Sequence, residues 1–235
     1  MNKIVENKLQ NVKIKYFMSN DVAFKTFFRK NHSMLKKVIS MSIRIKVQEI
    51  KKLVLLNTEL IKDTTNDKLG ILDLLVEIND NKKINIEIQN VDKHNFVERG
   101  EFYLSKLFVE NIEEGEDYAN LKHVYGIYFL NYDDKNYQNF YSVFENYDIM
   151  NLENTKTFKT MIIFNLAKID KIDKYNFSEE EKDILRFIKS KNERELIKMA
   201  EKRISLNKAM KQLREINADK ELKALLFHAE KRRLD

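Results

Sequence analysis

The sequence predicts an α/β fold: a central mixed sheet flanked by helices, followed by an α-helical C-terminal extension. Two observations support this expectation. Segments typical of strands, with β-branched residues and alternating or continuous apolar positions, lie between residues 51 and 166, among segments with helical periodicity. From Phe177 onward the strand patterns stop and only helical periodicity remains. We therefore expect a sheet-containing domain over residues 1–176 and a helical extension over residues 177–235.

Two helices are predicted before the first strand. Residues 1–18 are interpreted as a lead-in to them. Ser19 or Asn20 can cap the first helix, because such side chains accept hydrogen bonds from the unpaired N–H groups of a first turn. Ser33 is expected to open the second helix. The apolar residues at helical spacing are Phe24, Phe27, Phe28, Leu35, Val38 and Ile39.

Three strands follow, two of them joined as a hairpin. They are expected at residues 53–57, 71–76 and 84–89. The residues at 79–81, Asn-Asp-Asn, form a turn signal, because Asn and Asp tolerate the left-handed backbone of tight turns. The second and third strands should therefore lie side by side.

A long helix is predicted over residues 95–112, and three more strands at 124–130, 140–144 and 160–166. The order of helix, three strands, helix and strand places a sheet between helices.

The C-terminal extension begins with a capping box, in which Ser178 and Glu181 satisfy N–H groups of the first helical turn. Further helical patterns follow, and Asp219 is expected to cap the last helix. The apolar residues of that helix are Leu222, Leu225, Leu226 and Ala229. They must pack somewhere, either on the rest of the chain or on a second copy, and we expect a homodimer formed in part through these helices.

Composition excludes several classes of protein. The 235 residues include no Cys, which rules out disulfides, zinc–thiolate sites and thiol nucleophiles, and fits a reducing cytoplasm. No segment approaches the ~18 apolar residues of a membrane span, and the N-terminus lacks the apolar core of a signal peptide. We therefore expect a cytoplasmic protein without a membrane partner. The net charge of +6 is compatible with a basic groove but does not by itself indicate nucleic-acid binding.

Two acidic residues stand out among the strands. Asp73 lies in an apolar segment, where Asp is disfavoured, and the hairpin should bring it close to Glu87 on the neighbouring strand. An unpaired buried carboxylate is costly, which argues for a bound cation. Glu87 and Gln89 share one face of their strand, since side chains alternate between faces. Carboxylate oxygens suit Mg²⁺, with Mn²⁺ as the alternative, so the pair predicts a metal site. The competing interpretation is two solvated strand residues.

The order and spacing of several short motifs resemble the PD-(D/E)xK nuclease superfamily, and within it the Rpn family of recombination-promoting nucleases and transposases. The resemblance covers roughly residues 19 to 190 as a set. The motifs lie at residues 19–28, 72–73, 86–89, 96–99, 103–107 and 115–118, with a weaker one at 164–168. Leu72, His123 and Ala167 stand where the family has proline. Gln89 stands where most of the superfamily has a catalytic Lys, as is usual in this branch.

The resemblance implies roles for several residues. Asp73, Glu87 and the backbone carbonyl of Ile88 would hold the metal, and Gln89 would orient the attacking water or the scissile phosphate. Asp21 stands where the superfamily has a third acid on its first helix, although an Asp there also suits the helix dipole.

Nucleic-acid contacts are expected from two helices. Lys25 lies one turn after Asp21, so it would face phosphate or pair with Asp21. Arg99, Tyr103 and Lys106 form one stripe on the helix after Glu87, which suits a nucleic-acid backbone or a solvated helix face.

These residues lead to two hypotheses about function. The first is a Mg²⁺-dependent DNA endonuclease that hydrolyses phosphodiester bonds and, by resemblance, acts in recombination, mobile elements or phage defence. The second is a nuclease-fold module that binds nucleic acid or protein with weak or no catalysis, which the uncharged Gln89 would suit.

Overall fold

The computed structural model describes residues 9, 11–58, 72–92, 94–151, 153–155 and 158–234. The predicted lead-in at 1–18 and the predicted strand start at Ile71 lie partly or wholly outside the described residues. The chain packs as two compact units: the sheet unit, residues 46–171, and the helical unit, residues 1–45 with 172–235. The expected domain boundary at residue 176 stays a prediction, because packing units need not be folding domains.

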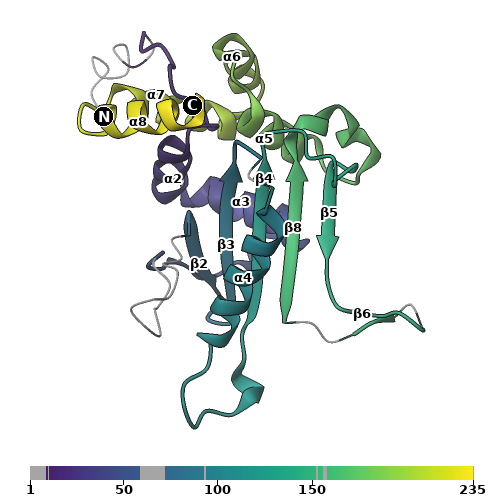
Figure 1. The fold of residues 1–235 in the computed structure, drawn as a ribbon. Coiled ribbons are helices and arrows are strands. Elements are labelled where there is room, and N and C mark those ends of the chain that lie inside the picture. The colour runs from purple at the N-terminus through teal and green to yellow at the C-terminus, as the bar shows by residue number, and fades with distance from the viewer. Residues whose placement is uncertain are drawn as a thin grey trace. The chain divides into compact units, whose positions relative to one another are not determined.

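The sheet unit contains a six-stranded mixed sheet, with strand order β1-β2-β3-β4-β8-β5 (Figure 1). Strands β3, β4 and β8 run parallel, and the remaining neighbours pair antiparallel. The bounds are β1 Leu53–Leu55, β2 Leu74–Ile78, β3 Lys82–Gln89, β4 His123–Leu130, β5 Tyr141–Phe144 and β8 Lys159–Asn165. The predicted mixed sheet between helices is confirmed, although β1 is shorter than expected.

The β2–β3 hairpin forms as predicted. Asn79 and Asp80 both adopt positive φ, with values of 51° and 57°, which their side chains tolerate better than most. The side chain of Asn79 also accepts hydrogen bonds from the N–H groups of Lys51 and Lys52 and donates one to the carbonyl of Glu49. The hairpin tip is thus fixed to the segment that leads into β1.

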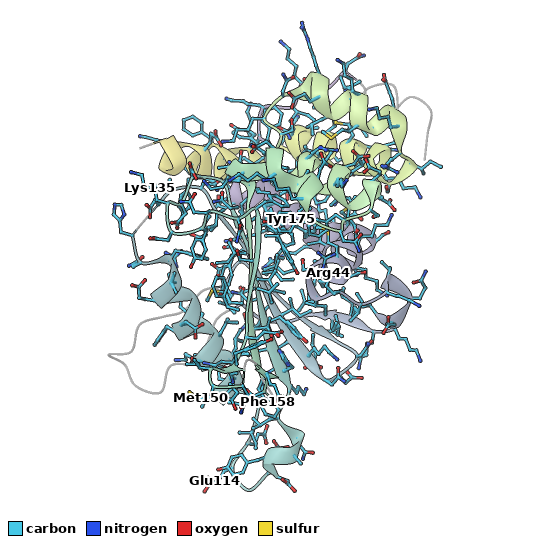
Figure 2. All side chains as sticks on the ribbon, turned by 90° about the vertical axis from the view of Figure 1, so that its right-hand side faces the viewer. Arg44, Glu114, Lys135, Met150, Phe158 and Tyr175 are labelled. Carbon is cyan, nitrogen blue, oxygen red and sulfur yellow. The ribbon has the colours of Figure 1, made fainter. Side chains whose placement is uncertain are left out.

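One face of the sheet is covered by α4, Phe96–Val109, which crosses in front of β3 and β4 in Figure 1. Two apolar clusters fill the interface. Their buried members are Phe96, Leu104, Tyr128, Leu130, Tyr137, Met161 and Ile163 in one, and Leu72, Leu75, Leu107 and Val124 in the other. The connection from α4 to β4 projects from this unit, with Glu114 at its tip (Figure 2).

Gly126 makes room in this interface for an aromatic ring. A Cβ atom at Gly126 would lie 2.5 Å from Cε2 and 2.9 Å from the hydroxyl of Tyr128. Gly100 on α4 is similarly close, since its Cβ would lie 3.4 Å from the same hydroxyl and 2.9 Å from Cε of Met161. The Tyr128 ring therefore lies over Gly126, beneath α4.

Several short elements have no counterpart in the sequence prediction. They are the 3₁₀ helices η1 Val47–Glu49, η2 Tyr118–Asn120 and η3 Leu166–Lys174, and the ribbon of β6 Tyr147–Asp148 and β7 Glu153–Asn154. The two shorter 3₁₀ helices and the ribbon are too short to produce a clear periodic pattern, and η3 is interrupted by non-helical backbone at Lys168.

The helical unit joins the two ends of the chain. Its helices are α2 Asp21–Lys30, α3 His32–Ile43, α5 Glu179–Lys189, α6 Glu193–Lys202, α7 Ile204–Ala218 and α8 Leu222–Leu234. The amide of Asn217 accepts hydrogen bonds from the N–H groups of Lys15 and Tyr16 and donates one to the carbonyl of Tyr16. The N-terminal helices and the C-terminal helices thus share one core.

The predicted helix caps are mostly confirmed. Asn20 caps α2, and Ser178 with Glu181 forms the capping box of α5. Asp219 accepts hydrogen bonds from the N–H groups of Glu221 and Leu222 at the start of α8. The prediction for α3 was wrong, because Asn31 and not Ser33 caps it. Asn31 ends α2 and can therefore serve both helices.

The last helix packs within its own chain. Helix α8 contacts α2 and α7, and the amide of Asn20 donates to the carbonyl of Leu226. Leu226 and Ala229 are buried, whereas Leu225 remains 55% exposed. Part of the apolar stripe assigned to a dimer contact is therefore covered inside the chain.

We expect Gly126→Ala to destabilise the protein by roughly 1–3 kcal/mol, the usual cost of overpacking a core. The added methyl meets the Tyr128 ring, which is buried and has little room to move away. Chemical denaturation measures the change, with Ser142→Ala on the edge strand β5 as a control expected within about 0.5 kcal/mol. Equal stability of the two variants would contradict this packing.

Candidate metal centre

The β2–β3 register places the two predicted carboxylates opposite each other. Leu74 pairs with Ile86, so continuing the antiparallel register by one residue sets Asp73 opposite Glu87. The N–H of Ile88 donates to Oδ2 of Asp73 over 3.3 Å, which holds this carboxylate at the end of the hairpin ladder. The hairpin thus brings together the pair that the sequence predicted.

Glu87 is almost fully buried, with 4% of its surface exposed. Its two oxygens each accept a hydrogen bond from a side-chain amide of its own strand. Nδ2 of Asn85 donates to Oε1 over 2.9 Å, and Nε2 of Gln89 donates to Oε2 over 2.8 Å. Residues 85, 87 and 89 share one face because side chains alternate along a strand. The carboxylate therefore sits between two fixed donors.

Burial and the neighbouring Asp73 together raise the pKa of Glu87 to about 7. Loss of hydration is the larger cause, and repulsion from the Asp73 carboxylate adds to it. The Asn85 and Gln89 amides and the charge of Arg99 act in the opposite direction but do not balance it. A divalent cation between the carboxylates would remove this penalty, so the pair suits a cation chemically.

Gln89 links the carboxylate to a positive charge on α4. Nη2 of Arg99 donates to Oε1 of Gln89 over 2.6 Å, while the amide nitrogen of Gln89 donates to Glu87. The three side chains form a chain from helix to strand. Arg99, assigned from the sequence to nucleic acid alone, therefore belongs to the carboxylate site as well.

The Ile88 carbonyl faces the same side as Asp73. Within a strand, the N–H and carbonyl of one residue point to the same neighbour. Because the Ile88 N–H reaches Asp73, the carbonyl also points to the β2 side of β3. Its predicted role as a third oxygen ligand fits this direction.

Oxygen ligands are few at this site. Within the described ranges, no group of three or more His, Cys, Asp or Glu side chains is placed to hold a metal ion. Mg²⁺ nevertheless binds proteins through one or two carboxylates and fills its other positions with water and substrate phosphate. Two carboxylates and one backbone carbonyl would leave coordination positions free for water and phosphate. The site therefore resembles an open catalytic metal site more than a structural one in which protein groups fill every position.

The two remaining residues of the predicted stripe lie farther along α4. Tyr103 packs partly buried against the cluster of Leu72, Leu75, Leu107 and Val124, so its ring has a packing role. Lys106 lies in the last turn of the helix and is half-buried. Their contacts with nucleic acid stay predictions.

Asp21 and Lys25 lie in α2, in the helical unit. The carboxylate of Asp21 accepts a hydrogen bond from the N–H of Val22, in keeping with the helix-start interpretation. Their predicted catalytic and nucleic-acid roles remain untested.

The sequence analysis missed two residues beside the pair, Asn85 and Tyr128. Asn85 lies two positions before Glu87, so strand alternation alone could have placed it on the same face. Tyr128 gave no such signal, because only the β3–β4 register sets it opposite Glu87.

A mixed sheet, a carboxylate pair at the end of a hairpin and a helix across that face define a nuclease-like α/β protein. The family model described as "PD-(D/E)XK nuclease family transposase" matches residues 18–235. The chain belongs to this family. No curated protein and no solved structure matches it. Across the parts that the structure describes, no helix has the length and apolar character needed to cross a membrane.

We expect the metal-free protein to lose stability as the pH rises from about 4.5 to about 7. The folded pKa of Glu87 lies above its ordinary value of 4.5, so in this window the folded state binds more protons than the unfolded state. The loss is up to about 3 kcal/mol, since one pKa unit corresponds to about 1.4 kcal/mol. Thermal unfolding in EDTA across this range measures it.

Glu87→Gln should flatten this pH dependence, because the amide is neutral and keeps the shape of the protonated acid. Glu114→Gln, in the exposed loop, is the matched control and should follow the wild-type curve. Parallel curves for the wild type and Glu87→Gln would show that Glu87 titrates normally.

Proposed function

We propose that this protein is a divalent-metal-dependent endonuclease that hydrolyses phosphodiester bonds of DNA. The observation that carries the proposal is the juxtaposition of Asp73 with the buried Glu87 at the end of the β2–β3 hairpin. The membership of this chain in a nuclease family supports the proposal. We also infer, from the family alone, that the cleavage serves DNA recombination, mobile elements or phage defence.

Asp73, Glu87 and the Ile88 carbonyl would hold Mg²⁺, with Mn²⁺ as the alternative. When bound, such a cation stabilises charge on the phosphoryl oxygens and lowers the pKa of a bound water. The protein's own part is to keep Glu87 ionised and oriented. The Asn85 and Gln89 amides do this by donating one hydrogen bond to each of its oxygens.

Arg99 supplies the positive charge that Gln89 lacks. A guanidinium has five N–H donors, and one of them is directed at Gln89. The others can bind a phosphate in the planar, paired geometry that Arg favours. Gln89 keeps a second amide N–H for a water or phosphate. The uncharged residue at position 89 is thus compatible with catalysis, because the charge comes from the neighbouring helix.

The proposed partner is DNA. A homodimer through the C-terminal helices, presenting two sites to a duplex, also stays a prediction. The packing of α8 on α2 and α7 gives it no support.

Asp73→Ala and Glu87→Ala should each reduce DNA cleavage at least a hundredfold while leaving the fold intact. Each removes an oxygen ligand, and neither side chain belongs to the apolar clusters beneath α4. A plasmid-nicking assay with Mg²⁺, Mn²⁺, Ca²⁺ or EDTA measures the effect, with circular dichroism as the folding check. Glu114→Ala is the control and should cleave like the wild type.

Two outcomes would contradict the proposal. Wild-type cleavage by both variants would place the chemistry elsewhere. A wild type that binds DNA without cutting it under any of these metals would favour the binding-module hypothesis.

Neutralising Arg99 and Lys106 together should weaken binding to all DNA sequences alike. Phosphate contacts carry no sequence information, and each one lost lowers the slope of log affinity against log salt by roughly 0.9 for duplex DNA. Fluorescence anisotropy in EDTA, which prevents cleavage, measures the slope for the double Ala variant. Lys159→Ala, whose side chain pairs with Glu101 and Ser105, is the control. An unchanged slope in the double variant would place the DNA groove away from α4.

A further inference from the structure

Two buried polar atoms beside Glu87 have complementary chemistry but no hydrogen-bond partner. They are the hydroxyl of Tyr128 and Oδ1 of Asn85. Their residues are 1% and 0% exposed. Leaving a buried polar atom unpaired is costly, so such atoms call for an explanation.

Strand register places these two side chains next to each other. Asn85 pairs with Gly126 across the parallel β3–β4 ladder, and neighbouring strands lie about 4.8 Å apart. The Tyr128 ring lies over Gly126, because a Cβ there would be only 2.9 Å from its hydroxyl. The hydroxyl therefore ends close to the Asn85 amide. The Asn85 side chain is near enough to act on the pKa of Tyr128, although neither Oδ1 nor the hydroxyl has a hydrogen-bond partner.

The nitrogen of the Asn85 amide already has a hydrogen-bond partner. It donates to Oε1 of Glu87, so the amide oxygen points away from the carboxylate. A hydroxyl that donates to this oxygen would fix the amide in that one orientation, since an Asn side chain otherwise rotates or flips. The direction of donation is then the same along the whole chain, from Tyr128 to Asn85 to Glu87.

We propose that Tyr128 and Asn85 are positioning residues of the metal centre. In the metal-loaded protein the Tyr128 hydroxyl donates to Oδ1 of Asn85, and the fixed amide directs a lone pair of Glu87 toward the cation. The inference rests on the proposed function, because it assigns these residues to the same site. Partners of this kind orient ligands, and losing one typically weakens metal binding or activity 10–100-fold.

The competing explanation is that Tyr128 only fills space beneath α4. Its ring contacts Phe96 edge-on, with centroids 5.1 Å apart, and belongs to the apolar cluster. Removing an idle, unpaired hydroxyl would then leave metal binding unchanged. The two explanations therefore differ in metal affinity and not in stability.

Tyr128→Phe tests the proposal, because it removes the hydroxyl and keeps the ring. Calorimetric titration of the metal-free full chain with Mn²⁺ should show about tenfold weaker binding. Thermal stability in EDTA should stay equal or rise, since an unpaired buried hydroxyl is lost. Tyr125→Phe is the matched control: Tyr125 is on the same strand, and alternation points it to the other face.

Asn85→Leu and the double variant Asn85→Leu/Tyr128→Phe provide a second measurement. Residues that act through one another are not additive, so the double variant should bind Mn²⁺ no more weakly than Asn85→Leu alone. Additive losses would overturn the coupling between the two residues. An unfolded Asn85→Leu leaves the Tyr128→Phe result decisive.

The same measurements distinguish a wrong positioning role for Tyr128 from a wrong proposed function. If the wild type binds Mn²⁺ and cleaves DNA while Tyr128→Phe binds equally well, only the positioning role is wrong. If the wild type neither binds Mn²⁺ nor cleaves DNA, both are wrong.

Discussion

Repulsion between two carboxylates at the end of one hairpin is the constraint on which the site depends. Asp73 and Glu87 face each other across β2 and β3, and Glu87 is nearly removed from water. Without a cation, the ionised pair loses hydration, and the hydrogen bonds that Glu87 accepts from Asn85 and Gln89 do not balance that loss. The fold keeps this unfavourable arrangement because the apolar packing around it is extensive. Strain of this electrostatic kind is typical of functional sites.

The packing that tolerates the strain comes from α4. The helix covers the sheet face that bears Glu87, and its buried residues interlock with those of β4 and β8. Two glycines, Gly100 and Gly126, allow the helix and the Tyr128 ring to approach the sheet closely. Close approach excludes water, which is also what raises the pKa of Glu87. Packing and electrostatics at this site therefore have one structural origin.

Helix α4 also brings a positive charge to the site, which the residue at position 89 does not provide. A Lys at position 89 would bring its ammonium into the site from the strand, whereas Gln89 has none. Arg99 reaches Gln89 from α4 and places a guanidinium next to the carboxylates. A guanidinium also presents several N–H donors in a planar arrangement that suits phosphate, which a Lys ammonium does not. The positive charge at the site therefore depends on how α4 packs over the sheet more than on the residue type at position 89.

The sequence by itself determined the features that depend on local periodicity and turn chemistry. These include the Asn79–Asp80 turn, the shared face of Glu87 and Gln89, the capping box at Ser178 and the order of helices and strands. Only the tertiary structure decided which distant residues meet. Strand register placed Tyr128 beside Asn85, helix packing placed Arg99 on Gln89, and α8 closed on α2 within the chain. Such contacts follow from how elements pack against one another, and a periodic pattern along the chain carries no information about the partner that each face will meet.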